Sequence, residues 1–133
     1  DFALFLPWEA GIKTDDEATL LSHLPIATME GDGSYQSFLE DLPAKHGIML
    51  RKSVSCSSFP MMAKTLRILK IAAILPEIAR EELSPEEFEM HKLKTLETLK
   101  QDLCICWNKR RALMNPTLQE LGQSLSNLVK DAE

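Results

Sequence analysis

Apolar residues recur at steps of three and four positions over much of this chain, which is the spacing of one face of a helix. Leu118, Leu121, Leu125 and Leu128 step by 3, 4 and 3 after a turn signal at Asn115 and Pro116. This seam predicts a last helix that packs against another helix.

A similar leucine stripe begins at Leu93 and follows the strong helix-start signal at Ser84 and Pro85. A Pro at the first helical position, with acids after it, is typical of a helix start. The pattern predicts a long helix over residues 85–114, forming a helical hairpin with the last helix.

Residues 61–75 are apolar on most sides, and Ser58 with Pro60 supplies a start signal before them. A helix apolar over so much of its circumference is normally central to a bundle. We expect it to kink at Pro76 and to continue to about Leu83.

The front of the chain predicts shorter elements. Thr14 and Glu17 have the spacing of a capping box before a helix over residues 15–24. A second helix of about eight residues is expected from Ser34, after a loop over residues 25–33. Residues 48–58 are expected to form a polar connector.

These elements predict an all-α fold, a helical bundle of four to six helices with a short N-terminal arm and a long C-terminal helical hairpin. Residues 1–13 would be the arm and residues 14–133 a single helical domain. Within that domain, residues 14–47 hold the short helices, residues 48–58 the connector and residues 59–133 the main bundle.

The charge is unevenly placed along the 133 residues. The chain has a net charge of −5, and residues 1–47 carry nine acids and only two bases. Phosphates would be repelled by that half, so nucleic acid is not the expected partner. Another protein, offering an acidic or helical segment, is the partner we expect.

Two basic groups are the candidate partner-binding residues, because cations beside an aromatic ring are enriched at binding sites. An alternative for the first group is the solvated face of a buried helix, and for the second a helix end that complements the dipole. The two groups are Lys64, Arg67 and Lys70, and Trp107, Lys109, Arg110 and Arg111.

The apolar start of the chain, DFALFLPW, resembles short docking peptides that insert aromatic rings into a groove. Phe2, Phe5 and Trp8 would be the inserted rings. The alternative is that this arm packs onto its own bundle. The leucine seam at positions 118, 121, 125 and 128 offers a further route, self-association.

The sequence offers little for catalysis or for a metal. His23, His46 and His91 lie on separate segments and belong to no catalytic signature. Cys104 and Cys106 would point about 200° apart on a helix, so they could not easily share one ion. We therefore expect a protein that is not an enzyme and that has no cofactor and no metal site.

The cysteines and the apolar runs predict the cellular compartment of the protein. Three cysteines leave at least one thiol unpaired, which favours a reducing compartment. No apolar run approaches the roughly 20 residues that cross a bilayer. Because the chain begins with Asp1, we expect a regulatory or scaffold domain of a larger intracellular protein, in the nucleus or the cytoplasm.

Two alternatives stay open for function. The first is a secreted four-helix signalling protein, which long helices joined by irregular segments would also fit. The second is a nucleic-acid-binding helical module that uses the basic groups.

Overall fold

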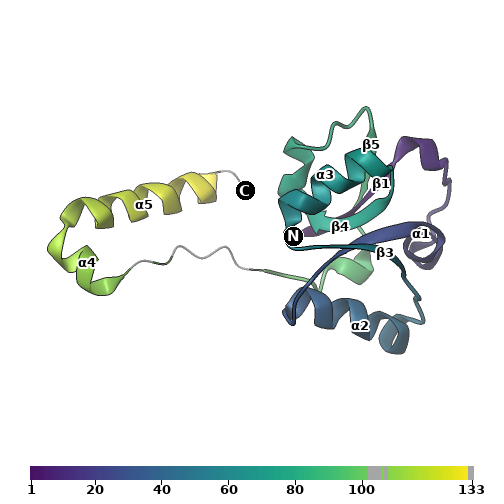
Figure 1. Ribbon diagram of the computed structural model, residues 1–133, viewed down its shortest axis with the longest axis horizontal. Helices are drawn as coiled ribbons and strands as arrows, with labels where there is room; N and C mark the ends of the chain where they lie inside the picture. The colour runs from purple at the N-terminus through teal and green to yellow at the C-terminus, as the bar shows by residue number, and fades with distance from the viewer. Residues whose placement is uncertain (102–105, 107, 132–133) are drawn as a thin grey trace. The chain divides into compact units, whose positions relative to one another are not determined.

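The computed structural model describes residues 1–101, 106 and 108–131. It divides into two compact units. Asp1–Gln101, here called unit 1, is built around a β-sheet, and Asp102–Glu133, here called unit 2, contains two helices (Figure 1).

Unit 1 has a five-stranded mixed sheet in the order β3-β2-β4-β1-β5. Strand β2 pairs in parallel with both β3 and β4, whereas β1 pairs antiparallel with β4 and β5. Four strands therefore run in one direction and only β1 opposes them. The strands are β1 (Phe2–Pro7), β2 (Pro25–Met29), β3 (Arg51–Cys56), β4 (Ala72–Pro76) and β5 (Phe88–His91).

Helices connect the parallel strands. Strand β3 lies on one side of β2 in the sheet, and β4 lies on the other side. The connection from β3 to β4 therefore passes over β2, in the opposite direction to the connection from β2 to β3. Because such crossovers are right-handed, the two connecting helices α2 and α3 lie on opposite faces of the sheet (Figure 1). The helices of unit 1 are α1 (Glu17–His23), α2 (Ser34–His46), α3 (Phe59–Leu69) and the 3₁₀ turns η1 (Trp8–Ala10), η2 (Glu77–Glu81) and η3 (Lys94–Leu96).

The core lies where the central strands are covered on both faces. All six residues of β1 are buried, as are the first four of β4. A strand buried on both sides shows a continuous apolar run instead of an alternating one. This explains why FALFL and AAIL carry no strand period in the sequence.

The expectation of an all-α helical bundle is wrong, because the sheet forms the centre of unit 1. The segment expected as an N-terminal arm is strand β1, held between β4 and β5. The expected loop at residues 25–33 contains β2, and the expected connector at residues 48–58 contains β3.

The apolar helix expected over residues 61–75, continuing to about Leu83, is cut short. Helix α3 ends at Leu69. Lys70 follows in a left-handed conformation (φ 50°), and its amide donates to the carbonyl of Leu66. The following apolar run becomes β4. Short apolar runs fit a buried strand and a buried helix equally well, so periodicity alone cannot separate them.

The long helix expected over residues 85–114 is also wrong. The predicted start forms only a turn, in which the Ser84 carbonyl accepts from the amides of Glu87 and Phe88. Phe88 then pairs with Pro7 in the sheet, and the chain continues as β5. The C-terminal hairpin is therefore much shorter than predicted.

Three helices form where they were predicted, although α2 is longer than expected. Helix α1 lies within the predicted residues 15–24, the last helix begins at Pro116, and α2 begins at Ser34 but continues to His46, beyond the predicted eight residues. In unit 2, α4 (Lys109–Met114) and α5 (Pro116–Asp131) contact each other. None of the helices in the described part of the chain is long and apolar enough to cross a membrane.

Candidate functional site

The carboxyl ends of β2 to β5 share one edge of the sheet, here called the carboxyl edge. At this edge β2 continues into α2 on one face and β3 into α3 on the other. In open α/β sheets, ligands bind outside the carboxyl ends of strands where the connections diverge in this way. The carboxyl edge is therefore the candidate site of unit 1.

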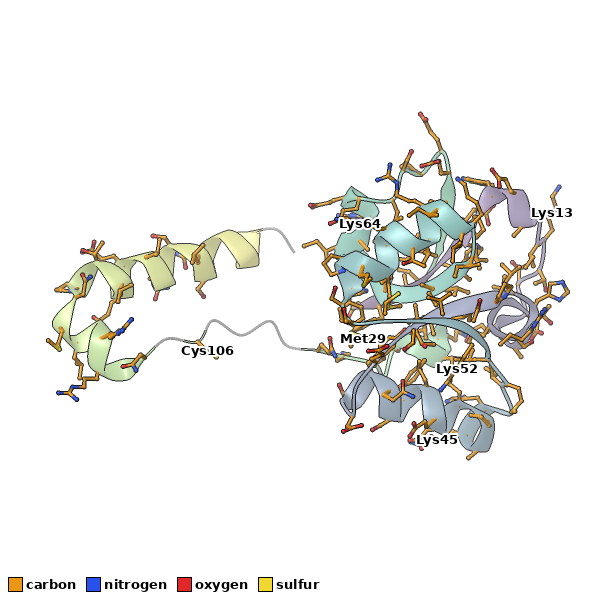
Figure 2. All side chains as sticks on the ribbon, in the orientation of Figure 1. Lys13, Met29, Lys45, Lys52, Lys64 and Cys106 are labelled. Carbon is orange, nitrogen blue, oxygen red and sulfur yellow. The ribbon has the colours of Figure 1, made fainter. Side chains whose placement is uncertain are left out.

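The loop between β2 and α2 forms one half of this edge, and all its residues from Glu30 to Gly33 are exposed. The Glu30 amide donates to the Cys56 carbonyl at 2.8 Å, which ties the ends of β2 and β3 together. Gly31 adopts φ 120°, which a residue with a side chain adopts only with strain. Figure 2 labels Met29 where β2 ends.

Helix α2 begins without a side-chain cap, since its N-cap residue is Gly33. The first four amides of a helix have no acceptor within the helix. Those at the start of α2 are at an exposed position and carry the positive end of the helix dipole. They are suited to donate to an acceptor outside the protein.

Helix α3 forms the other half of the edge. The Ser58 hydroxyl accepts from the Met61 amide at 3.4 Å, and Pro60 has no amide hydrogen to offer. Ser57 is exposed and Ser58 half-buried beside it. The Ser57 hydroxyl donates to the Met61 sulfur at 3.5 Å. The start of a second helix, with a serine on the chain before it, thus lies at the same edge as α2.

An aromatic cluster of Phe2, Tyr35 and Phe59 packs under the two helix starts. The ring centroids lie 5.5 Å apart for Tyr35 and Phe59, 5.7 Å for Phe2 and Phe59, and 6.0 Å for Phe2 and Tyr35. The Tyr35 hydroxyl donates to the carbonyl of Ile74 at 3.1 Å. The cluster fixes α2 and α3 relative to β1 and β4.

Burial, together with the nearby Cys56 thiol, raises the pKa of Tyr35 well above its ordinary value of 10.0. The phenol therefore stays protonated and acts as a hydrogen-bond donor. Its role in this cluster is to position the backbone of the edge.

The charges at the carboxyl edge have both signs. Glu30 and Asp32 are exposed carboxylates on the loop, while the uncapped start of α2 presents amide hydrogens and partial positive charge. A ligand that carries both an acidic and a basic or hydroxyl group matches this arrangement.

The first basic group predicted from the sequence lies on α3. Lys64, labelled in Figure 2, and Arg67 are exposed, and the helix has no acid. Lys70 instead pairs with Glu87 at 3.1 Å and lies 5.5 Å from the centre of the Phe88 ring. The structure therefore brings Lys64 and Arg67 onto one surface and gives Lys70 partners within unit 1.

The structure describes only two side chains of the second predicted basic group. Arg110 and Arg111 are exposed in α4. Trp107 and the side chain of Lys109 lie outside the described residues. Of the leucine seam, Leu118 is half-buried, Leu121 and Leu125 are exposed, and the side chain of Leu128 is outside the described part.

The three aromatic rings predicted to dock into a partner have different surroundings. Phe2 and Phe5 are buried in β1. Trp8 is 53% exposed, and its indole nitrogen donates to the Pro85 carbonyl at 2.8 Å. Only Trp8 is therefore accessible to another molecule.

A small hollow of about 100 Å³ lies beside Trp8, lined also by Ile12, Lys13 and Glu89. Ligand sites usually enclose about 300–1,000 Å³, so this hollow suits a few water molecules. Among the described residues, no group of three or more His, Cys, Asp or Glu side chains is placed to hold a metal ion. Cys56 is buried and Cys106 exposed, both as free thiols.

In comparisons with known proteins, no family model matches this chain, and no curated protein matches it either.

Sequence reasoning missed the carboxyl edge because it assigned the two strands before it to loops. The signal was present as PIATM followed by the glycine-rich EGDGS, and as RKSVSC followed by SSFP. The first is a short apolar run that leads through small residues into a helix start, whereas in the second only Val54 is β-branched. That order is typical of a βα unit.

Proposed function

We propose that the chain is a non-catalytic recognition module whose unit 1 binds a small polar ligand at the carboxyl edge. One observation carries the proposal: the connections after β2 and β3 diverge to opposite faces of the sheet, which places two helix starts beside one another at the same edge. The aromatic cluster beneath them makes this edge rigid, and rigid sites lose less entropy on binding.

The groups at the edge suggest what the ligand carries. An acidic group is favoured by the uncapped start of α2 and by the Ser57 hydroxyl. A basic or hydroxyl group is favoured by Glu30 and Asp32. Amino acids and hydroxy acids combine these features, so they are the first compounds to test.

Thermal denaturation of the full chain in the presence of amino acids, hydroxy acids, simple dicarboxylates and inorganic phosphate tests this proposal. A ligand that binds the folded state raises the melting temperature. Recovery of the compound unchanged after long incubation checks that the module is not catalytic. If no compound in these classes raises the melting temperature, the proposal is wrong.

Two serines of the β3 segment provide a matched pair of variants. Ser57→Glu places a negative charge at the carboxyl edge, whereas Ser53→Glu places the same charge on β3 away from that edge; both positions are exposed. We expect S57E to weaken binding of an acidic ligand by at least about tenfold, or about 1.4 kcal/mol, and S53E to leave it unchanged. Equal effects of the two variants would contradict the placement of the site.

Protein recognition through the outer face of α3 is a second candidate function. Met61 and Ile68 are 52% and 78% exposed there, next to the exposed cations Lys64 and Arg67. Apolar side chains beside cations suit an acidic segment of another protein. Binding of a synthetic amphipathic Leu/Glu peptide, lost in Lys64→Glu/Arg67→Glu and kept in Lys13→Glu/Lys45→Glu, tests this surface.

The same variants address nucleic acid. If duplex DNA binds the chain with steep salt dependence and K64E/R67E abolishes that binding, α3 is a nucleic-acid surface instead. The secreted four-helix alternative is not carried further, because it required a helical bundle.

We also propose that the protein is intracellular. The free thiols of Cys56 and Cys106 are suited to a reducing compartment. Thiol counting by mass spectrometry on native protein tests this, and a disulfide in protein isolated from its native source would contradict it.

A further inference from the structure

Helix α5 carries a stripe of leucines that unit 2 does not cover. Leu121 is 54% exposed and Leu125 is 43% exposed, while Leu118 one turn earlier is half-buried. The neighbouring helix α4 adds Leu113 and Met114, which are 70% and 79% exposed. Exposed apolar side chains gathered in this way mark interaction surfaces.

We infer that the leucine stripe (Leu118, Leu121 and Leu125) binds the same stripe of a second copy of this chain, with the two α5 helices antiparallel. The inference concerns unit 2 and is independent of the ligand site proposed for unit 1.

The residues beside the stripe permit this pairing. Thr117 and Ser124 flank the leucines at exposed positions of α5, and neither is charged. Two identical surfaces therefore meet without like charges at the seam.

Charge complementarity selects the antiparallel orientation. The exposed Arg110 and Arg111 of α4 lie just before the start of α5. In a parallel pair these arginines would face the arginines of the other copy and repel them. In an antiparallel pair they lie near the C-terminal end of the partner helix, where the helix dipole is negative.

The length of α5 limits the strength of the pair. Its 16 residues span about 24 Å, or roughly two heptads. Isolated helices of this length are marginal, so the pair must be held by a few leucines per copy. We expect a dissociation constant of roughly 10–100 μM, which corresponds to about 5.5–7 kcal/mol.

Sedimentation velocity of the full chain over about a hundredfold range of concentration around that value tests the inference. We expect the average mass to rise from monomer toward dimer. Leu121→Glu and Leu125→Glu should each weaken dimerisation by at least about tenfold, because they bury a charge in the seam. Gln123→Glu, on the opposite side of α5, is the matched control and should leave the mass unchanged.

Charge reversal tests the orientation. Arg110→Glu/Arg111→Glu should weaken an antiparallel pair by about fivefold or more, since it replaces attraction to the helix end by repulsion. In a parallel pair the variant would exchange one repulsion for another, and mixing it with unmodified chain would strengthen association. Circular dichroism of each variant confirms that helix content is kept.

Two outcomes overturn the inference. One is a chain that stays monomeric at every concentration. The other is a dimer that Q123E weakens as much as L121E does, because the leucines would then not form the contact.

Discussion

The two units of this chain use apolar side chains in opposite ways. Unit 1 hides leucines, alanines and aromatic rings around a central sheet, and β1 is buried along its whole length. Unit 2 places Leu113, Met114 and Leu121 in the solvent. Unit 1 can therefore hold itself together, whereas the apolar surface of unit 2 is available for association.

The largest expected effect breaks the core of unit 1. Phe5 is 1% exposed, so Phe5→Ala leaves a cavity in the centre of the sheet and should lower the free energy of unfolding by about 3–5 kcal/mol. Leu121→Ala in unit 2 should change it by no more than about 0.5 kcal/mol at low protein concentration. Urea denaturation followed by circular dichroism measures both, and similar losses would contradict the contrast between the units.

The next effect concerns the segment after β5, which Glu17 holds against α1. Its carboxylate accepts from the Lys94 amide at 2.7 Å, the Thr95 amide at 3.0 Å and the Thr95 hydroxyl at 2.6 Å. Glu17→Gln should lower the free energy of unfolding by about 1–3 kcal/mol, because it removes the charge and replaces one accepting oxygen by an NH2 group, which cannot accept from Lys94 or Thr95. Glu97→Gln, at an exposed position, should have little effect.

The same carboxylate predicts a pH dependence. Partial burial alone would raise the pKa of Glu17, but the hydrogen bonds from Thr95 and Lys94 and the charge of Lys94 outweigh it and hold the pKa below the ordinary 4.5. The stabilisation is therefore fully present above pH 4.5 and is lost as the pH falls through the lower folded value. Denaturation curves of E17Q should lack this part of the acid dependence, and an unchanged dependence would contradict the assignment.

A smaller effect tests the aromatic cluster. Tyr35→Phe keeps the ring but removes the donor to the Ile74 carbonyl, so the free energy of unfolding should fall by about 1 kcal/mol. Because the folded pKa of Tyr35 is raised, its contribution is present below pH 10.0 and is lost as the pH rises above that value. The variant should lose less stability than the unmodified chain between neutral pH and pH values above 10.

The smallest effect is expected at the surface of unit 1. Lys70 and Glu87 form an ion pair whose side chains are 35% and 44% exposed. Glu87→Gln should change the free energy of unfolding by less than about 1 kcal/mol, and added salt should reduce the difference further. A larger loss would show that the contact of Lys70 with the Phe88 ring depends on this pair.

Local signals in the sequence predicted helix starts well. Ser58 caps α3 and α5 begins at Pro116 as expected. Even the wrong start at Ser84 forms its hydrogen bonds, including one from the Glu86 amide to the Ser84 hydroxyl. These contacts lie within a few residues of one another, so the sequence alone specifies them. The predicted capping box of Thr14 and Glu17 is wrong, because Asp16 caps α1 through the Thr19 amide and the Glu17 carboxylate accepts from Lys94 and Thr95 instead.

The secondary structure of the segments after these helix starts could not be predicted from local signals. The chain after Ser84 leaves the turn because Phe88 pairs with Pro7, a residue far away in the sequence. The run AAIL becomes β4 because β1 and β2 lie on both sides of it. Partners that distant are invisible to a search for periodicity, and tertiary pairing overrides local preference.

The candidate site was missed for the same reason. Ser57, Ser58 and Gly33 stand at the carboxyl edge only because β2 and β3 are neighbours in a parallel sheet. Without the strands, these residues looked like an ordinary polar loop. Lys64 and Arg67, in contrast, were identified from the sequence because both stand on one helix.

The position of β1 determines when this protein can fold during synthesis. Within this sheet, β1 is translated before β4 and β5, the two strands between which it lies. The apolar residues 2–7 therefore stay unpaired until residues 72–91 have been translated. Such delayed pairing is slow and exposes the nascent chain to aggregation, so chaperones that shield hydrophobic segments should bind this N-terminal stretch.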